Sequence, residues 1–130
     1  MAKLKATFPI YQTAEGRGGD GRLDRLATAI AEVRAGARPS PRTVKLLSAG
    51  APKIVQKVIE EAAEVGIGAM QGDRRAVISE SVDLFYNLLT LWSEMGIAPC
   101  EVWAEMDRRE ATLGMAEKLP KVAAEEIQAA

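Results

Sequence analysis

Residues 53–94 read KIVQKVIEEAAEVGIGAMQGDRRAVISESVDLFYNLLTLWSE, and their pattern predicts two helices joined by a short turn. Residues 53–70 carry apolar side chains at helical spacing, and residues 74–95 are apolar nearly all round. Between them, the tripeptide QGD at 71–73 offers a glycine that suits the end of one helix and an aspartate that suits the N-cap of the next. The pattern predicts a helical hairpin.

Each predicted helix carries two carboxylates three residues apart, Glu61 and Glu64 on the first and Glu80 and Asp83 on the second. Side chains at this spacing project from one face of a helix. If the helices pack antiparallel, the four side chains converge into an all-oxygen ligand set, which suits Mg²⁺ or Mn²⁺ better than Zn²⁺. The alternative is that each pair lies on a solvated face. An isolated buried carboxylate is costly, so a pair on an otherwise apolar helix favours the metal site.

Three neighbouring residues extend this candidate site. A carboxylate outside the ligand set, Glu60 or Glu61, would orient an attacking water as general base. Lys57, one turn before Glu61, is either an intrahelical ion-pair partner or a phosphate ligand. Asn87, one turn after Asp83, is either a contact for a base or sugar or a satisfied core amide.

The two helices also predict a core. On the first helix the expected core residues are Ile54, Val58, Ala62, Val65 and Ala69. Gly66 and Gly68 are costly inside a helix and predict close approach of another backbone or a ligand. The second helix has one polar stripe, formed by Ala76, Glu80, Asp83, Asn87, Thr90 and Glu94. The stripe is either the solvent side or part of a site, and the remaining apolar arc is too wide for one packed face, which suggests that two chains share a core.

The rest of the chain adds further helices. Apolar periodicity predicts a helix over residues 22–35 and a short one over 43–49, and Pro99 opens another that runs to about residue 113. Strand signals are absent outside the first dozen residues. We therefore expect an all-α bundle of four to five helices.

The expected domain organisation has three parts. Residues 1–20 are polar and rich in glycine toward their end, and predict a flexible arm. Residues 21–118 form the helical domain, and residues 119–130 form a C-terminal tail. At 130 residues the chain fits a single domain.

Composition excludes several classes of function. The chain has no histidine, which removes Ser-His triads and the commonest zinc ligand. Its formal net charge of −1 argues against a nucleic-acid-binding domain. A single cysteine, no recognisable signal peptide and no apolar run of about 18 residues predict a cytoplasmic protein with no membrane segment.

Charge is unevenly distributed along the chain. From Ala76 to Asp107 there is no lysine or arginine, but six acidic residues. Basic residues flank this stretch, and Arg108 and Arg109 follow it directly. The arrangement suits a polyphosphate whose metal is held by carboxylates and whose phosphates are held by cations such as this arginine pair. The alternative is an acidic solvent face with ordinary surface arginines.

The motifs EEAAE at 60–64 and ESVD at 80–83 resemble the EExxE…ExxD signature of the all-α nucleoside triphosphate pyrophosphohydrolases, the MazG-like superfamily. Within that superfamily the chain is most similar to the phosphoribosyl-ATP pyrophosphohydrolase family of histidine biosynthesis. The similarity runs from about residue 23 to residue 121 and includes LDRL at 23–26 and DLFY at 83–86.

The resemblance implies hydrolysis between the α and β phosphorus atoms of phosphoribosyl-ATP, dependent on Mg²⁺, to give phosphoribosyl-AMP and pyrophosphate. It also implies a homodimer whose helices build a shared core. By position, the metal ligands would be Glu61, Glu64, Glu80 and Asp83, with Glu60 beside them. The candidate substrate contacts would be Lys57, Asn87, Arg108, Arg109 and Lys118.

Several positions depart from the family pattern. Residues 41–43 read PRT where the family has Ser-Tyr-Thr or Ser-Trp-Thr, Ile59 replaces a glycine, and Asn87 replaces a histidine. These changes keep open the alternative of a house-cleaning pyrophosphohydrolase of nucleoside or deoxynucleoside triphosphates. A separate alternative is a non-catalytic helical dimer, which the intact set of four carboxylates disfavours.

Overall fold

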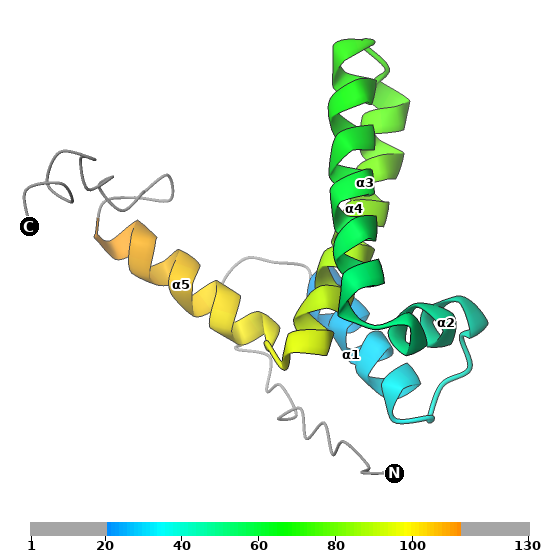
Figure 1. Cartoon of the computed structure of the whole chain (residues 1–130). Coiled ribbons are helices and arrows are strands. Elements are labelled where there is room, and N and C mark those ends of the chain that lie inside the picture. The colour runs from blue at the N-terminus through cyan, green and yellow to red at the C-terminus, as the bar shows by residue number, and fades with distance from the viewer. Residues whose placement is uncertain (1–20, 113–130) are drawn as a thin grey trace, which may run out of the picture. The chain divides into compact units, whose positions relative to one another are not determined.

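In a computed structural model of the chain, residues 21–112 are described, and they form five helices and no strand (Figure 1). This confirms the predicted all-α class. The helices are α1 (Arg22–Arg34), α2 (Pro41–Ala49), α3 (Ala51–Met70), α4 (Arg74–Met95) and α5 (Pro99–Ala111). The predicted arm at 1–20, the predicted tail at 119–130 and Lys118 lie outside the described residues.

Helices α3 and α4 form the predicted antiparallel hairpin and lie side by side over their length (Figure 1). Gly72 takes a positive φ of 68° in the turn between them, a conformation that glycine adopts at little cost. Asp73 is the N-cap of α4, and its carboxylate accepts a hydrogen bond of 3.0 Å from the backbone N–H of Ala76. The local signals in the QGD turn therefore set the hairpin.

Two helices begin slightly earlier than the sequence pattern predicts. α2 begins at Pro41 rather than at residue 43, and α3 begins at Ala51 rather than at residue 53. In both cases a proline stands in the first turn, where its missing N–H costs nothing. Gly50 separates the two helices with a φ of 81°.

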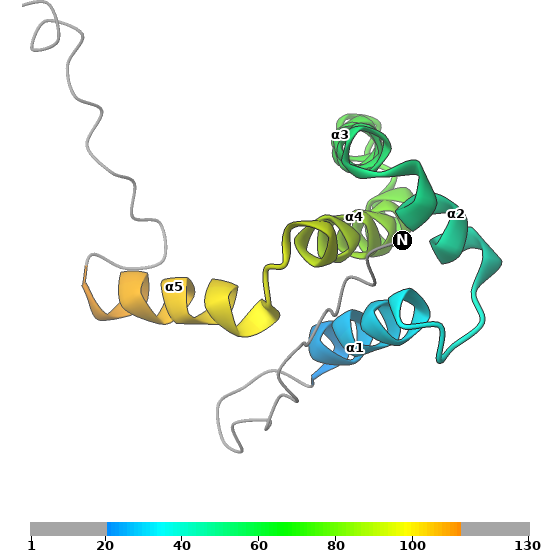
Figure 2. The ribbon, with the colours of Figure 1, turned by 60° about the horizontal axis from the view of Figure 1, so that its bottom comes forward.

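The core lies where α1 crosses α4 and where α2 meets α1 and α3 (Figure 2). Its fully buried large apolar side chains are Ile30 of α1, Ile54 of α3 and Leu89 of α4. An ion pair supports the contact of α1 with α4, since Arg34 donates to Glu94 at 2.8 Å and to the Ser93 hydroxyl at 3.0 Å. Segments that are far apart in the sequence, α1, the α2–α3 region and α4, therefore pack around one core.

The predicted core face of α3 is partly wrong. Ile54 is buried and Val58 and Val65 are half-buried, but Ala62 and Ala69 are exposed. The buried positions are instead Glu61 and Gly68, which lie on the same line as Ile54 at intervals of seven residues. The physical reason is the close approach of α4 at Gly68, where an added Cβ would lie 3.3 Å from the Cβ of Ala76.

Gly66 does not make the predicted close approach within the described chain. Gly66 is exposed, and an added Cβ there would meet nothing within 4 Å. Of the two glycines in α3, only Gly68 is therefore explained by the packing of α3 against α4.

The polar stripe of α4 faces the interior of the chain. Asn87 is 1% exposed and Thr90 is 0% exposed. By contrast, Ile78, Val82 and Phe85 are 53%, 62% and 45% exposed. The stripe is thus not the solvent side, and part of the apolar arc of α4 is exposed in the single chain.

Helix α5 belongs to a second compact unit that begins at Cys100, whereas the first unit ends at Pro99. Of its predicted core side, Val102 and Trp103 are half-buried and Met106 is exposed. Within the part of the chain that the structure describes, no helix combines the length and apolar character needed to cross a bilayer.

Candidate active site

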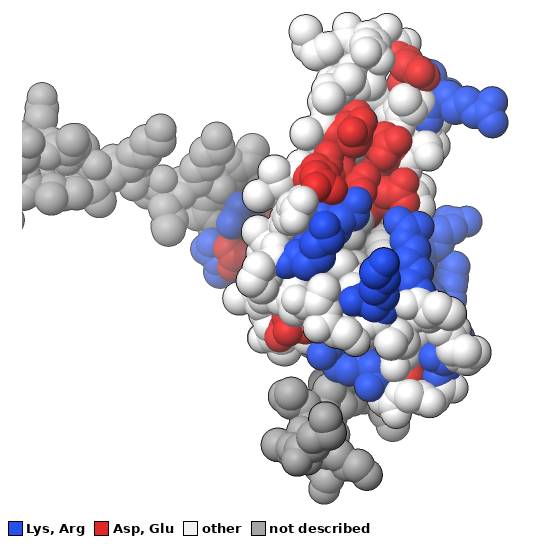
Figure 3. Space-filling view, turned by 45° about the vertical axis from the view of Figure 1, so that its right-hand side comes forward, with Lys and Arg blue, Asp and Glu red and all other residues white. Residues whose placement is uncertain are grey.

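Three carboxylates meet between α3 and α4. Glu61 of α3 and Glu80 and Asp83 of α4 each offer one oxygen, and these oxygens all lie within 4.8 Å of one another. Glu61 is buried and the other two are half-buried. Figure 3 shows acidic side chains gathered on this face of the hairpin, with basic side chains directly beneath them. We call Glu61, Glu80 and Asp83 the carboxylate cluster.

The geometry of the hairpin produces the cluster. Glu80 and Asp83 are three residues apart, so they project from one side of α4. Glu61 shares the buried line of α3 with Ile54 and Gly68, which is the line that packs against α4. The predicted convergence of the two carboxylate pairs is therefore achieved for three of the four residues.

The fourth predicted ligand, Glu64, lies one turn beyond Glu61 on α3 and is exposed. It does not belong to the group of oxygens within 4.8 Å. Its charge nevertheless reaches Glu80, since it contributes to raising the pKa of that carboxyl group. Glu64 thus lies at the edge of the carboxylate cluster.

The cluster is electrostatically unfavourable by itself. The pKa of Glu80 is raised above its usual value. The largest cause is burial, the next is the hydrogen bond with the adjacent Glu61 carboxyl, and the third is the negative charge of Asp83. Both desolvation and like charge disfavour an ionised carboxylate. A cation placed among these oxygens would offset both costs.

The ligand set fits a hard divalent cation. Carboxylate oxygens are the preferred ligands of Mg²⁺ and Mn²⁺, and such ions usually share their sites with water and substrate phosphates. An octahedral Mg²⁺ with bonds of about 2.1 Å holds its oxygens about 3 to 4 Å apart. The observed limit of 4.8 Å therefore needs only a small side-chain movement. Within the described residues, no histidine or cysteine joins this group.

Lys57 lies beside the cluster and pairs with two carboxylates. Its Nζ is 3.0 Å from Glu61 and 3.1 Å from Glu60. The hydrogen bonds with Glu61 and then Glu60 raise the pKa of Lys57, so it stays protonated. Lys57 and then Gln56, which donates to Glu60 at 2.7 Å, lower the pKa of Glu60. The ion-pair reading of Lys57 is confirmed, and a phosphate role is left as a proposal.

Asn87 is buried, and only the NH₂ group of its side-chain amide has a hydrogen-bond partner among the described residues. Its Nδ2 donates to the backbone carbonyl of Asp83 at 2.8 Å. Its Oδ1 is buried and has no hydrogen-bond partner among the described residues. Asn87 is therefore neither a fully satisfied core amide nor an exposed contact residue in this structure.

A hydroxyl network that the sequence reasoning missed connects α2 to α4. The Thr43 and Tyr86 hydroxyls share a hydrogen bond of 2.6 Å, and Ser40 donates to Thr43 at 3.0 Å. The guanidinium of Arg42 lies 5.7 Å from the centre of the Tyr86 ring. Tyr86 lies in the DLFY segment that resembles the family, and Thr43 is the one residue of 41–43 that keeps the family pattern, but only packing shows that the two residues meet.

The predicted arginine contacts lie in α5, in the second unit. Arg108 and Arg109 each donate to Glu105, at distances of 2.9 to 3.0 Å. Arg108 and then Arg109 lower the pKa of Glu105 to about 2. Both arginines are therefore engaged with a carboxylate of their own helix.

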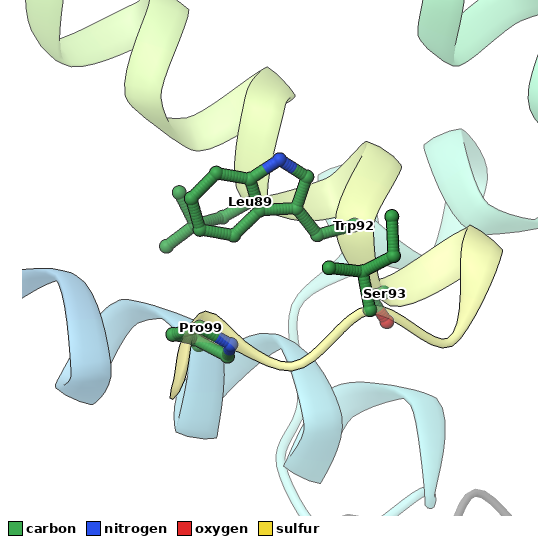
Figure 4. Close-up of a pocket in the computed structure, with 6 residues that line it drawn as sticks. Leu89, Trp92, Ser93 and Pro99 are labelled. Carbon is green, nitrogen blue, oxygen red and sulfur yellow. The ribbon is translucent and has the colours of Figure 1, made fainter. Parts of the chain in front are cut away.

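A small pocket lies elsewhere, between α1 and the end of α4 (Figure 4). Its lining includes Leu89, Trp92, Ser93 and Pro99. None of its lining residues carries a carboxylate or a basic group. The pocket therefore offers no carboxylate ligand for a metal and no cation for a phosphate.

The fold and the cluster together define a class: a helical protein whose central hairpin presents a carboxylate site suited to a divalent cation. The family model of phosphoribosyl-ATP pyrophosphohydrolase matches residues 23–110. The chain belongs to this family, which places it among the pyrophosphohydrolases and confirms the resemblance seen in the sequence.

Similar proteins come from several bacteria. The chain is 52% identical over 99 residues to phosphoribosyl-ATP pyrophosphatase 2 of Rhodopseudomonas palustris, which covers 76% of each chain. It is 48% identical over 101 residues to a protein of the same name from Bradyrhizobium diazoefficiens, covering 78% of this chain and 75% of that one. It is 47% identical over 97 residues to phosphoribosyl-ATP pyrophosphatase of Azospirillum brasilense, covering 74% and 86%.

Proposed function

We propose that this chain hydrolyses the α–β phosphoanhydride of phosphoribosyl-ATP in the presence of Mg²⁺, releasing phosphoribosyl-AMP and pyrophosphate. The observation that carries the proposal is the convergence of Glu61, Glu80 and Asp83 in a chain of this family. The names of the relatives support the substrate.

The proposed metal ligands are Glu61, Glu80 and Asp83, and Glu64 joins them after a change of its side-chain rotamer. Mn²⁺ is the expected substitute for Mg²⁺, since both accept oxygen ligands. When bound, the ion supplies positive charge against the phosphates during cleavage. The raised pKa of Glu80 supports this assignment, because its causes are burial and the neighbouring carboxylates, and a cation would offset both.

Glu60 and Glu61 are the proposed catalytic carboxylates. Glu60 lies outside the carboxylate cluster and directly precedes Glu61 in the sequence, and Gln56 and Lys57 hold its two oxygens in place. Lys57 and Asn87 are proposed substrate contacts on α3 and α4, and Arg108, Arg109 and Lys118 are proposed contacts further along the chain. For Lys57 the support is its position beside the cluster.

We further propose that the enzyme is a cytoplasmic homodimer in which residues 21–118 form one catalytic domain. Apolar side chains are exposed in stripes along both hairpin helices. On α4 the stripe is Ile78, Val82 and Phe85, at intervals of four and three residues. On α3, Val55 and Ile59 are exposed one turn apart. Exposed apolar surface of this kind marks interaction sites, and a second copy would bury it.

The test is pyrophosphate release with Mg²⁺ from phosphoribosyl-ATP, set against a panel of nucleoside and deoxynucleoside triphosphates. We expect turnover of phosphoribosyl-ATP that Glu80→Gln abolishes. Glu32→Gln removes a charge from an exposed pair with Arg38 and should retain activity. Turnover of the other nucleotides instead would identify a house-cleaning enzyme, and silence on every substrate would identify a non-catalytic dimer.

A further inference from the structure

The ammonium group of Lys57 lies beside the carboxylate cluster, where its positive charge would repel a bound metal ion. It is 3.0 Å from Glu61, the most buried residue of the carboxylate cluster. A monovalent ammonium and a divalent cation that share one carboxylate repel each other at short range. The described residues thus place a lysine in partial competition with the ion that the cluster suits.

Lys57 also has a second partner that lies outside the cluster. Glu60 accepts from Lys57 at 3.1 Å, and Gln56 holds the other carboxylate oxygen of Glu60 at 2.7 Å. Glu60 is therefore held in place independently of Lys57. The lysine can leave Glu61 and keep an ion pair, and its flexible four-carbon chain permits the movement.

We propose that Lys57 is a built-in counter-ion of Glu61 that the metal displaces, so that metal binding transfers the ammonium wholly to Glu60 at the rim of the site. This rests on the proposed metal site. In the metal-free protein Lys57 partly neutralises the buried Glu61. In the metal-bound protein it pairs with Glu60 alone and presents its charge to incoming phosphates. Lys57 thereby couples metal binding to phosphate binding.

The experiment is calorimetric titration of Mn²⁺, with no nucleotide present, into the full chain and its variants at one pH. If Lys57 competes with the ion, Lys57→Gln should bind Mn²⁺ about three- to tenfold more tightly than wild type. Lys53→Gln is the matched control, since it removes the same charge one turn earlier, where Lys53 contacts Gln56 at 3.5 Å. Its affinity should stay within about twofold of wild type, because exposed distant charges are screened.

A double-mutant cycle tests the role of Glu60. If Glu60 acts on the metal through Lys57, Glu60→Gln should weaken Mn²⁺ binding in the wild-type background and much less in the Lys57→Gln background. Circular dichroism in EDTA verifies that each variant is folded.

The outcomes distinguish failure of the role inferred for Lys57 from failure of the proposed metal site. Equal or weaker binding by Lys57→Gln would overturn the inference, because it would mean that Lys57 orients Glu61 for the ion instead of competing with it. Absence of Mn²⁺ binding by the wild-type chain would disprove the proposed metal site itself, and the inference with it.

Discussion

At the scale of single residues, the main feature is negative charge held at a helix interface. Glu61, Glu80 and Asp83 lie within 4.8 Å of one another, and Lys57 supplies one positive charge beside them. Like charges at this distance disfavour the folded state, and the proposed cation would offset that cost. Removing a carboxylate from the cluster should therefore stabilise the metal-free fold and weaken metal binding.

Asp83→Asn should separate the two effects. Because it removes one of three like charges, the variant should melt at a higher temperature than wild type in EDTA. In Mg²⁺ the variant should not gain the thermal stabilisation that the metal gives wild type, because its metal affinity should fall by about 10–100-fold. It should also lose turnover. Thermal melts in EDTA and in Mg²⁺ measure the first two effects, and pyrophosphate release measures the third.

The control for this prediction is Asp107→Asn, which removes an exposed carboxylate of α5. It should leave the shift caused by Mg²⁺ unchanged. If Asp83→Asn retained the full thermal shift with Mg²⁺, Asp83 would not be a metal ligand.

The raised pKa of Glu80 predicts a pH dependence. The folded chain holds this proton more tightly than the unfolded chain, whose carboxyl group has the usual value of 4.5. The corresponding stability is present below pH 4.5 and is lost as pH rises through the folded pKa. In EDTA, wild type should therefore lose stability relative to Glu80→Gln as pH rises above 4.5.

Melting curves of both proteins across this pH range make the comparison. The lowered pKa of Glu105 acts in the opposite direction, since it adds stability as pH rises, but it is common to both proteins and cancels in the difference. A difference in melting temperature that does not change with pH would contradict the assignment.

At the scale of helices, the hairpin depends on one close contact. Gly68 lets α3 approach α4, with an added Cβ 3.3 Å from Ala76 and 3.4 Å from Val77. Gly66, two residues earlier, has open space around it. The two glycines differ in local packing although they share a helix, which makes them a matched pair.

Gly68→Val should destabilise the fold by about 1–3 kcal/mol, because a branched side chain overpacks the interface. Gly66→Ala should be neutral or stabilising by up to about 1 kcal/mol, because alanine favours a helix interior. Urea denaturation of both variants measures the difference. Equal effects at the two positions would show that the contact at Gly68 does not constrain the hairpin.

At the scale of the molecule, α4 carries two opposite surfaces. Its polar stripe is buried within the chain at Asn87 and Thr90, whereas Ile78, Val82 and Phe85 are exposed. A helix with this inversion is unusual for an isolated domain, since exposed apolar patches mark binding surfaces. The exposed stripe is the physical basis for the proposed homodimer.

Val82→Lys should therefore disrupt the dimer, because it places a charge in the centre of the exposed stripe. Light scattering coupled to size-exclusion chromatography should show a dimer for wild type and a monomer for the variant. Val44→Lys, at an exposed position of α2, is the control. If Val82→Lys remained a dimer, the subunits would meet through another surface.

The sequence by itself determined the helical class, the hairpin and most of the candidate site. Helical periodicity, the QGD turn and the i, i+3 carboxylates are local signals, and α4 does begin at the Asp73 cap. The spacing predicts two carboxylate pairs, each on one face of its helix, and three of those four residues meet in the structure.

Only the tertiary structure decided which sides of these helices are buried. Ala62 and Ala69 were expected in the core and Glu61 and Gly68 replace them, because the rotation of α3 about its axis is set by the close contact with α4. The hydroxyl pair of Thr43 and Tyr86 joins residues 43 positions apart, which no local pattern encodes. Spacing determines which residues share a face, but contact between faces depends on the packing of the whole chain.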